Sequence, residues 1–319
     1  MWNLFKLSTL ALAISVASHD GMAQSAPTIS SPTKLGYEIL VTDGIARSGG
    51  AKLPSGEPII SSPITSTLIF GRTDAILIDP PMSIQQTREV IDWIVRSGKN
   101  LKYIYTTHGH GDHWAGTKQI LDRFPNAIPY ATSETIAHMH QQNAPEIRQM
   151  FERNFPGQLG ETPVLARPIP SSGLDLEGNA VLAVEVGHSD TDDTTVLYVP
   201  SLALVAAGDV VYNGVHAFLL ESGKGGLDAW LKALDKVEAL HPKIVIAGHK
   251  NKELKDDSAS IGETRQYLQD AKRLLAARPT PKDYYLQMIG LYPDHINPGP
   301  LWYSGLALLS GTNLLTNGK

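Results

Sequence analysis

The sequence predicts an α/β protein in which two mixed β-sheets pack together and helices lie outside them. Short runs rich in β-branched residues alternate with longer segments whose apolar residues recur at helical spacing, and this alternation occurs twice along the chain. Four expected strands also end at a histidine or an aspartate. In layered α/β folds, functional side chains gather at strand ends. We therefore expect these four ends to converge on one rim: His108, His188, Asp209 and His249.

Each expected element has its own signal. Residues 65–71 and 74–80 are β-rich runs split by a Gly-Arg-Thr turn, so they are expected to form a hairpin. Residues 83–98 have apolar side chains at helical spacing, with Ser83 as the expected N-cap and a glycine at the end. The other expected strands are 37–46, 101–108, 179–187, 194–200, 202–209 and 243–249, and the other expected helices are 114–125, 133–155, 226–242 and 260–277.

Composition excludes several classes of protein. The chain has 319 residues, of which 42% are hydrophobic and 18% charged, and its net charge of −5 is spread along the sequence without a basic block. This is ordinary globular composition and gives no sign of a nucleic-acid partner. Cysteine is absent, which excludes disulfides, thiolate metal ligands and a cysteine nucleophile.

The N-terminus resembles a secretory signal peptide over residues 1–23. Lys6 precedes an apolar run over residues 7–17 that is too short to span a bilayer, and Gly21 and Ala23 are small residues at a plausible cleavage point. The alternative is a buried N-terminal helix. We expect a periplasmic or secreted protein with no membrane association after cleavage. An extended or disordered segment (24–35) and one domain (36–319) with a helical, aromatic C-terminal tail are expected to follow.

The stretch YIYTTHGHGDHWAG contains the densest group of ligand-type side chains. His108, His110, Asp112 and His113 lie within six positions, and the glycines between them leave room for a tight turn. A lone histidine is more often a satisfied surface or core residue. Four such side chains together indicate a borderline divalent metal such as zinc.

These four side chains face different directions, so they need two ions or more distant ligands. His188, Asp209 and His249 each follow a glycine at the end of an expected strand. Taken alone, they have ordinary interpretations as a loop residue, a helix cap and a turn histidine. Their shared setting favours a common metal centre.

This order of residues closely resembles the metallo-β-lactamase fold superfamily of metallohydrolases. The resemblance implies an αββα sandwich with the site at one edge and two divalent ions, Zn²⁺ first, with Fe, Mn or Ni also compatible. His108, His110 and His188 would hold the first ion; Asp112, His113 and His249 would hold the second; and Asp209 would bridge them. Asp79 matches a recurrent supporting acid, although a turn residue is an equal alternative.

The same resemblance implies hydrolysis without a covalent intermediate. Two close ions share a water, supply a hydroxide nucleophile and polarise the attacked carbonyl. Asp112 could relay a proton to the leaving group. Tyr212 lies three residues after Asp209, as in lactonases of this superfamily, where the phenol can support the oxyanion. The alternative for Tyr212 is packing on the following loop.

We therefore expect an exported dinuclear hydrolase that acts on a small carboxylic ester, with a lactone as the first candidate. β-Lactamase or glyoxalase-II-like thioesterase activity is the alternative. True β-lactamases of the superfamily use a cysteine ligand or lack the bridging acid, and this chain has no cysteine and has Asp209. A non-catalytic metal-binding protein is a third hypothesis. The apolar C-terminal tail is expected to pack on the domain or to form a homodimer.

Overall fold

The computed structural model describes residues 32–160 and 163–312. The expected signal peptide, residues 1–23, lies outside these ranges and stays a prediction. The first strand of the described fold, β1, spans Gly36–Thr42. None of the described helices combines the length and the apolar character needed to span a bilayer.

The first sheet contains six strands and combines antiparallel and parallel pairing. Its order is β1-β2-β3-β4-β5-β6. β1 to β3 form an antiparallel meander that contains the expected hairpin, and β3 to β6 run parallel. After β1, the strands are β2 (Ile64–Phe70), β3 (Asp74–Ile78), β4 (Asn100–Tyr105), β5 (Ile128–Ala131) and β6 (Arg167–Pro168).

The second sheet has the order β11-β10-β9-β8-β7 and is also mixed. β10 pairs in parallel with β11, and the other neighbours are antiparallel. Its strands are β7 (Leu174–Leu176), β8 (Asn179–Gly187), β9 (Thr194–Val199), β10 (Leu204–Asn213) and β11 (Ile244–Lys250).

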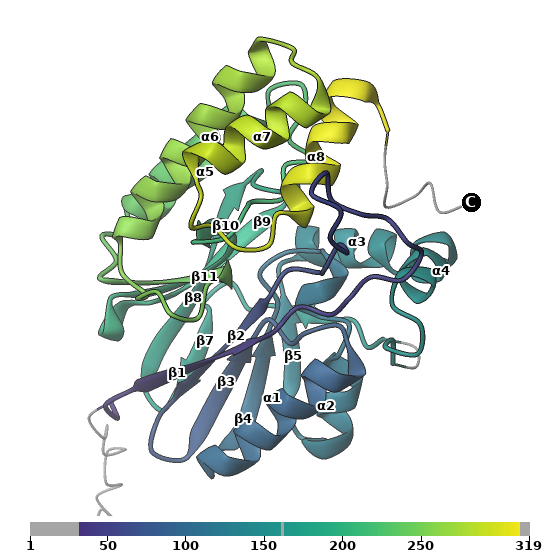
Figure 1. Cartoon of the computed structure of the whole chain (residues 1–319). Helices are drawn as coiled ribbons and strands as arrows, with labels where there is room; N and C mark the ends of the chain where they lie inside the picture. Colours follow the sequence, from purple (N-terminus) through teal and green to yellow (C-terminus); the bar gives the residue numbers. More distant parts are fainter. Residues whose placement is uncertain (1–31, 161–162, 313–319) are drawn as a thin grey trace, which may run out of the picture. The chain divides into compact units, whose positions relative to one another are not determined.

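Helices flank the two sheets, as Figure 1 shows. α1 and α2 pack on the outer face of the first sheet through an apolar cluster that includes Val90, Ile94 and Ile120. α5 and α6 cover the second sheet around Trp230 and Leu268. The helices are α1 (Ile84–Ser97), α2 (Thr117–Arg123), α3 (Ser133–Gln142), α4 (Pro145–Asn154), α5 (Gly226–Glu238), α6 (Ala259–Ala276), α7 (Pro281–Leu291) and α8 (Gly299–Ser310). Ser83 caps α1 as expected, since its side chain accepts from the backbone N–H of Gln86.

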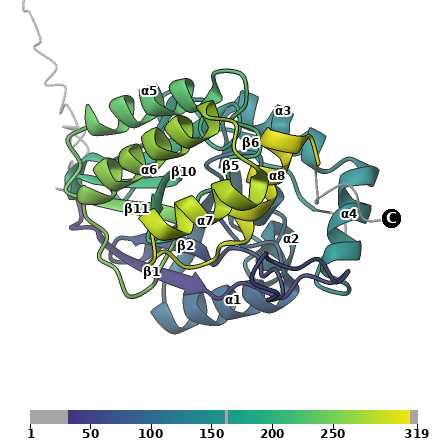
Figure 2. The same ribbon diagram turned by 45° about the horizontal axis from the view of Figure 1, so that its top comes forward.

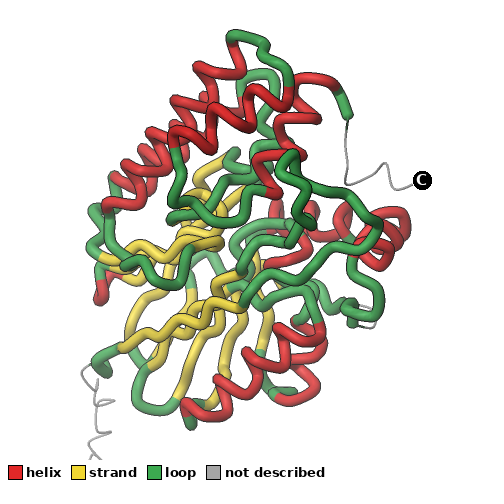
Figure 3. The backbone as a smooth tube through the Cα atoms, viewed as in Figure 1, coloured by secondary structure: helices red, strands yellow, loops and turns green. Residues whose placement is uncertain are grey.

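A separate apolar cluster fills the space between the sheets. Ile76 and Tyr105 come from the first sheet, and Leu197, Leu204 and Ile246 come from the second. The strands of both sheets face one another around this layer (Figure 3). The predicted αββα sandwich is therefore confirmed, with two mixed sheets inside and helices outside.

Two strand ends differ from the expected ones, and both differences affect the site. β4 ends at Tyr105 rather than His108, because the backbone N–H of Thr107 donates to Asp79 Oδ1 instead of to a neighbouring strand. β10 continues beyond Asp209 to Asn213, because it goes on pairing with β11 after a shift in register. Asp209 therefore lies inside a buried strand.

The C-terminal segment packs on the domain. Ile296 forms a parallel bridge with Val215, and the hydroxyl of Ser304 on α8 accepts from the backbone N–H of Leu219. Figure 2 shows α7 and α8 lying beside one another, and Gly305 allows α8 to approach the ring of Tyr284 on α7. This is the first of the two packing arrangements expected for the tail, and the homodimer stays a prediction.

Candidate metal centre

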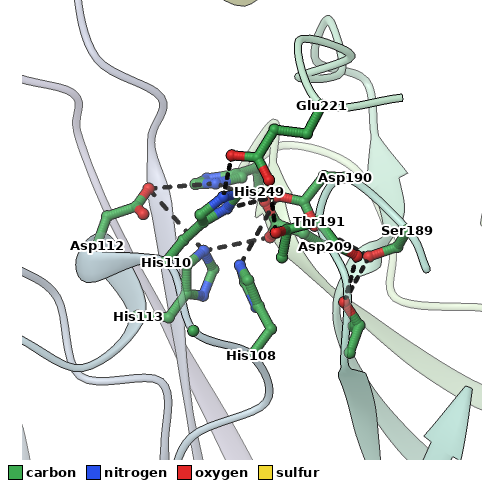
Figure 4. A network of polar contacts seen from close by, with 12 residues as sticks. His108, His110, Asp112, His113, Ser189, Asp190, Thr191, Asp209, Glu221 and His249 are labelled. Carbon is green, nitrogen blue, oxygen red and sulfur yellow. Dashed lines mark hydrogen bonds and ion pairs between the residues drawn. The ribbon is translucent and has the colours of Figure 1, made fainter. Parts of the chain in front are cut away.

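Seven ligand-type side chains converge where the edges of the two sheets meet (Figure 4). The segment after β4 contributes four of them, and the second sheet with its β8–β9 loop contributes three. They are His108, His110, Asp112, His113, Asp190, Asp209 and His249. Six of these seven residues were expected from the sequence.

The first trio consists of His108, His110 and Asp190. Asp190 Oδ2 lies 2.8 Å from His110 Nδ1 and 3.8 Å from His108 Nε2. His108 and Asp190 are fully buried, and the side chain of His110 is 13% exposed. Two imidazole nitrogens and one carboxylate oxygen thus face a common point.

The second trio consists of Asp112, His113 and His249. Asp112 Oδ2 lies 3.6 Å from His249 Nε2 and 3.9 Å from His113 Nε2. Both histidines are buried, whereas the Asp112 side chain is 41% exposed. Asp112 therefore forms the open side of the centre.

Asp209 lies between the two trios. Its Oδ1 is 3.3 Å from His113 Nε2, and its Oδ2 is 3.1 Å from His249 Nε2. It also groups with His108 and His113 as a third possible ligand trio. This is the bridging position that the sequence resemblance implied for Asp209.

Four ligand-type atoms in this cluster are buried and make no well-aligned hydrogen bond to a described residue, although Asp190 Oδ2 and Asp209 Oδ1 lie at ion-pair distance from histidine nitrogens. Buried polar atoms are normally satisfied, so four such atoms facing one another indicate a ligand. Neutral imidazoles and carboxylates together suit zinc and other borderline divalent ions. The residues therefore fit two divalent metal ions. The four atoms are His108 Nε2, His113 Nε2, Asp190 Oδ2 and Asp209 Oδ1.

The outward-facing ring nitrogens of the four histidines are held in place. Each lies within hydrogen-bond distance of an oxygen, the arrangement that orients metal-binding histidines and fixes their tautomer. The pairs are His108 Nδ1 with Thr107 Oγ1 (3.1 Å), His110 Nε2 with Glu221 Oε1 (3.1 Å), His113 Nδ1 with Asp79 Oδ2 (3.1 Å) and His249 Nδ1 with the Pro63 carbonyl oxygen (2.6 Å).

Of the two supporting carboxylates, the sequence indicates Asp79 but not Glu221. The sequence allows two equal roles for Asp79, as a support for the site or as a turn residue. The structure places it beside the cluster, where it also accepts from the backbone N–H and the hydroxyl of Thr107. Glu221 was not expected, because no strand end or motif marks it. Its second oxygen accepts from the Thr191 hydroxyl, which fixes the carboxylate beside His110.

The electrostatic setting favours the ligand forms of His108 and Asp209, whereas neighbouring carboxylates outweigh burial and raise the pKa of His110, His113 and His249 above the ordinary value. Burial and the neighbouring His113 lower the pKa of His108 well below its ordinary value, so its imidazole is neutral. Burial opposes ionisation of Asp209, but His249 and His113 outweigh it and hold the carboxyl pKa well below its usual range. A neutral imidazole and an ionised carboxylate are the forms that bind a cation.

His188 does not join the first trio, in contrast to its expected place. Its Nδ1 lies 2.7 Å from Asp192 Oδ1, and its Nε2 lies 3.4 Å from Ser222 Oγ. The reason is the turn after β8, where Gly187 has a φ of 98° and the pairing with β9 shifts register. This turn directs Asp190 into the cluster and His188 away from it.

Tyr212 also differs from its expected role at the substrate. Its hydroxyl donates to Asp209 Oδ2 at 2.7 Å, and the residue is 4% exposed. It is not among the residues that line the pocket above the cluster. Burial and then the charge of Asp209 raise the pKa of its phenol well above the ordinary value, so the hydroxyl stays protonated. Tyr212 therefore positions Asp209.

A cavity of about 270 Å³ opens directly above the cluster. Its floor includes His110, Asp112, Asp190, Asp209 and His249. Most of its walls are apolar and come from the β1–β2 connection, from α4 and from the segment after β10. Representative wall residues are Ile59, Met82, Met150, Phe151, Phe218 and Tyr303.

Comparison with known proteins agrees with this architecture. A family profile described as the metallo-β-lactamase superfamily matches residues 61–249, more than half of the chain and all seven clustered residues. A type 2 metallo-β-lactamase from Bacteroides fragilis is 22% identical over 191 residues, covering 59% of this chain and 69% of that protein. Hydroxyacylglutathione hydrolase 1 from Vibrio vulnificus is 33% identical over 60 residues, covering 19% of this chain and 23% of that protein. The chain thus spans about a quarter of the length of the hydroxyacylglutathione hydrolases it matches.

Solved structures show the same fold. A metallo-β-lactamase from Pontibacter korlensis superposes with a TM-score of 0.53 at 19% identity, covering 76% of this chain and 96% of that one. A metallo-β-lactamase family protein from Thermus thermophilus gives a TM-score of 0.56 at 16% identity, covering 84% and 92%. The profile match, the sandwich and the clustered ligand set agree: this chain belongs to the metallo-β-lactamase superfamily.

Proposed function

We propose that the protein is a two-metal hydrolase of small carboxylic esters, with a lactone as the first candidate substrate. The observation that carries this proposal is the pair of ligand trios that meet at Asp209 on the floor of an apolar cavity. His108, His110 and Asp190 would hold one ion, and Asp112, His113 and His249 would hold the other. Zinc is the proposed metal, and iron, manganese and nickel accept the same ligands.

Two bound divalent ions would lower the pKa of a shared water and polarise the carbonyl under attack. The chain's own residues prepare this chemistry. Tyr212 fixes Asp209 between the trios, so this carboxylate would be held in place for both ions. Asp112 lines the cavity with a partly exposed carboxylate, and we assign it the transfer of a proton to the leaving alcohol.

The character of the cavity favours an uncharged ester over a glutathione thioester. Glutathione carries two carboxylates, which call for several cationic side chains. Arg47 is the only Arg or Lys among the described residues that line the cavity, and its Nε donates to Asn154 Oδ1 at 2.9 Å. The apolar walls suit the acyl chain or ring of an ester.

Hydroxyacylglutathione thioesters and β-lactams are the alternative substrates, because relatives named for these activities match parts of the chain. The experiment is substrate profiling of the zinc-loaded protein. The panel contains homoserine lactones of several acyl lengths, aryl esters, a hydroxyacylglutathione and a chromogenic cephalosporin. Fast cephalosporin turnover without lactone or ester turnover would overturn the proposal. The His110→Ala variant is the control, because activity that it retains comes from a contaminant or from another site.

We also propose export from the cytoplasm, supported by the signal-like sequence of residues 1–23. Expression of the full chain followed by fractionation tests it. The expected result is a shortened protein in the periplasm or the medium. Retention of the full-length chain in the cytoplasm would contradict it.

A further inference from the structure

We propose that Tyr303, on α8, is a catalytic residue that donates a hydrogen bond to the substrate carbonyl oxygen as that oxygen gains negative charge. This inference rests on the proposed ester hydrolysis. It replaces the role first expected of Tyr212, whose hydroxyl donates to Asp209 and is therefore engaged. No proton is transferred: the Tyr303 O–H bond remains intact while the carbonyl oxygen accepts the hydrogen bond and later returns to a carboxylate.

The position of Tyr303 supports this role. It lines the same cavity as Asp112, Asp209 and His249. Its ring stands edge-on to Phe218 at 5.9 Å between centroids, and Phe218 in turn stands edge-on to His110 at 5.5 Å. α8 therefore forms part of the wall of the cavity that lies over the cluster.

The hydroxyl of Tyr303 is available. It makes no hydrogen bond to any described residue. Its oxygen is also not one of the fully buried polar atoms that lack a partner, so it is not enclosed in the core. By contrast, two other tyrosine hydroxyls in this half of the chain are engaged: Tyr267 with His216 at 3.1 Å and Tyr292 with Asp270 at 2.9 Å. A hydroxyl that lines the cavity without an intramolecular partner can donate a hydrogen bond to a substrate oxygen.

The electrostatic setting keeps this donor protonated. Burial, and then the negative charge of Asp112, raises the pKa of the Tyr303 phenol above its ordinary value. A phenol that stays neutral at physiological pH donates a hydrogen bond to an anion, whereas an ionised phenolate would repel it. An uncharged donor is what an oxyanion requires.

The scaffold also fixes the ring in position. Ser304, the next residue, accepts from the backbone N–H of Leu219 at 3.0 Å, and Gly305 packs against the ring of Tyr284. α8 is thus joined both to the segment after β10 and to α7. Donors that are held before the substrate arrives stabilise the transition state most effectively.

The test compares Tyr303→Phe with Tyr284→Phe in the zinc-loaded protein. Tyr284 is a suitable control because its hydroxyl is buried without a partner and does not line the cavity. The substrates are p-nitrophenyl butyrate and N-butanoyl homoserine lactone. For Tyr303→Phe we expect kcat to fall by about 10²–10³-fold with little change in KM, as for removal of one oxyanion donor. The zinc content and melting temperature of both variants should match those of the wild type. The kinetics of Tyr284→Phe should also match those of the wild type.

A binding measurement separates failure of this inference from failure of the proposed function. Calorimetry with p-nitrophenyl methylphosphonate, a stable tetrahedral anion, does not depend on turnover. Loss of the Tyr303 donor should weaken its binding about tenfold or more. If the wild type hydrolyses neither ester, the proposed function fails, and the phosphonate alone decides on Tyr303. Unchanged kcat in an active Tyr303→Phe protein, unchanged phosphonate affinity, or an equal loss in Tyr284→Phe would overturn the inference.

Discussion

The hydroxyl of Tyr212 donates to Oδ2 of Asp209 at 2.7 Å. Tyr212 itself pairs with His249 on the neighbouring strand β11. The same aspartate oxygen lies 3.1 Å from His249 Nε2. Tyr212 therefore fixes the carboxylate that lies between the two ligand trios. Its effect on catalysis should pass through the metal ions.

Tyr212→Phe should weaken metal binding by about 10–100-fold, the usual effect of removing a group that orients a ligand. Competition with a chromogenic chelator measures the affinity of both sites. Tyr303→Phe is the matched control, because its hydroxyl does not contact a ligand. Normal metal affinity combined with a large loss of kcat in Tyr212→Phe would return the oxyanion role to this residue.

Asp190→Asn should lower the bound metal from two ions per chain to one. The amide keeps the size of the side chain and removes the carboxylate that faces His108 and His110. His188→Ala should keep both ions, since the His188 ring contacts Asp192 and Ser222 outside the cluster. Elemental analysis after dialysis gives the stoichiometry.

Asp192→Asn is a control for Asp190→Asn, because it removes a neighbouring exposed carboxylate from the same loop. It should bind two ions. The reverse pattern, with loss of an ion in His188→Ala and none in Asp190→Asn, would show that the loop rearranges when metal binds.

Gly248→Ala should lose metal and lower the melting temperature. An added Cβ would collide with Asp209 Oδ1 and with the backbone of Gly208, so either the bridging carboxylate or the strand must move. Gly262→Ala in α6 is the control. Its Cβ meets open space, and alanine is favoured over glycine in a helix by about 1 kcal/mol. A Gly248→Ala protein with two tightly bound ions would contradict this packing.

Glu177→Gln should destabilise the fold at neutral pH and lose this effect in acid. The carboxylate accepts from the backbone N–H groups of Arg72, Thr73 and Asp74, and these bonds, chiefly the one from Asp74, lower its pKa to about 2 from an ordinary 4.5. Because the folded pKa is the lower one, the stabilisation is complete above pH 4.5 and disappears as the pH falls towards 2. Urea midpoints of both proteins at several pH values should converge in that interval. A constant difference would contradict the assignment.

The sequence was sufficient to predict the sandwich and six of the seven clustered ligand-type side chains. Strand-and-helix periodicity depends on local residue types, and the local pattern around His108 and His113 is dense enough to indicate metal without any tertiary information. Asp209 and His249 could be found because each follows a glycine on a buried strand. At Gly208 and Gly248 the structure gives the reason, since a side chain there would strike Thr107 or Asp209.

The remaining residues depend on turn geometry and on distant contacts. A register shift between Glu185 and Gly187, at the end of β8, decides whether His188 or Asp190 faces the cluster, and such a shift cannot be predicted from hydrophobic periodicity. Glu221 and Tyr303 reach the site only through the folding of the segment after β10 and the return of α8. Neither has a local signature.

The clustered side chains come from both sheets of the sandwich, and this has a consequence for assembly. His108 to His113 follow β4, whereas Asp190, Asp209 and His249 come from the second half of the chain. Neither half contains a complete pair of sites. Metal binding should therefore come late in folding, after both halves of the chain have packed together. A cation bound there would link the two sheets at the edge that carries the site.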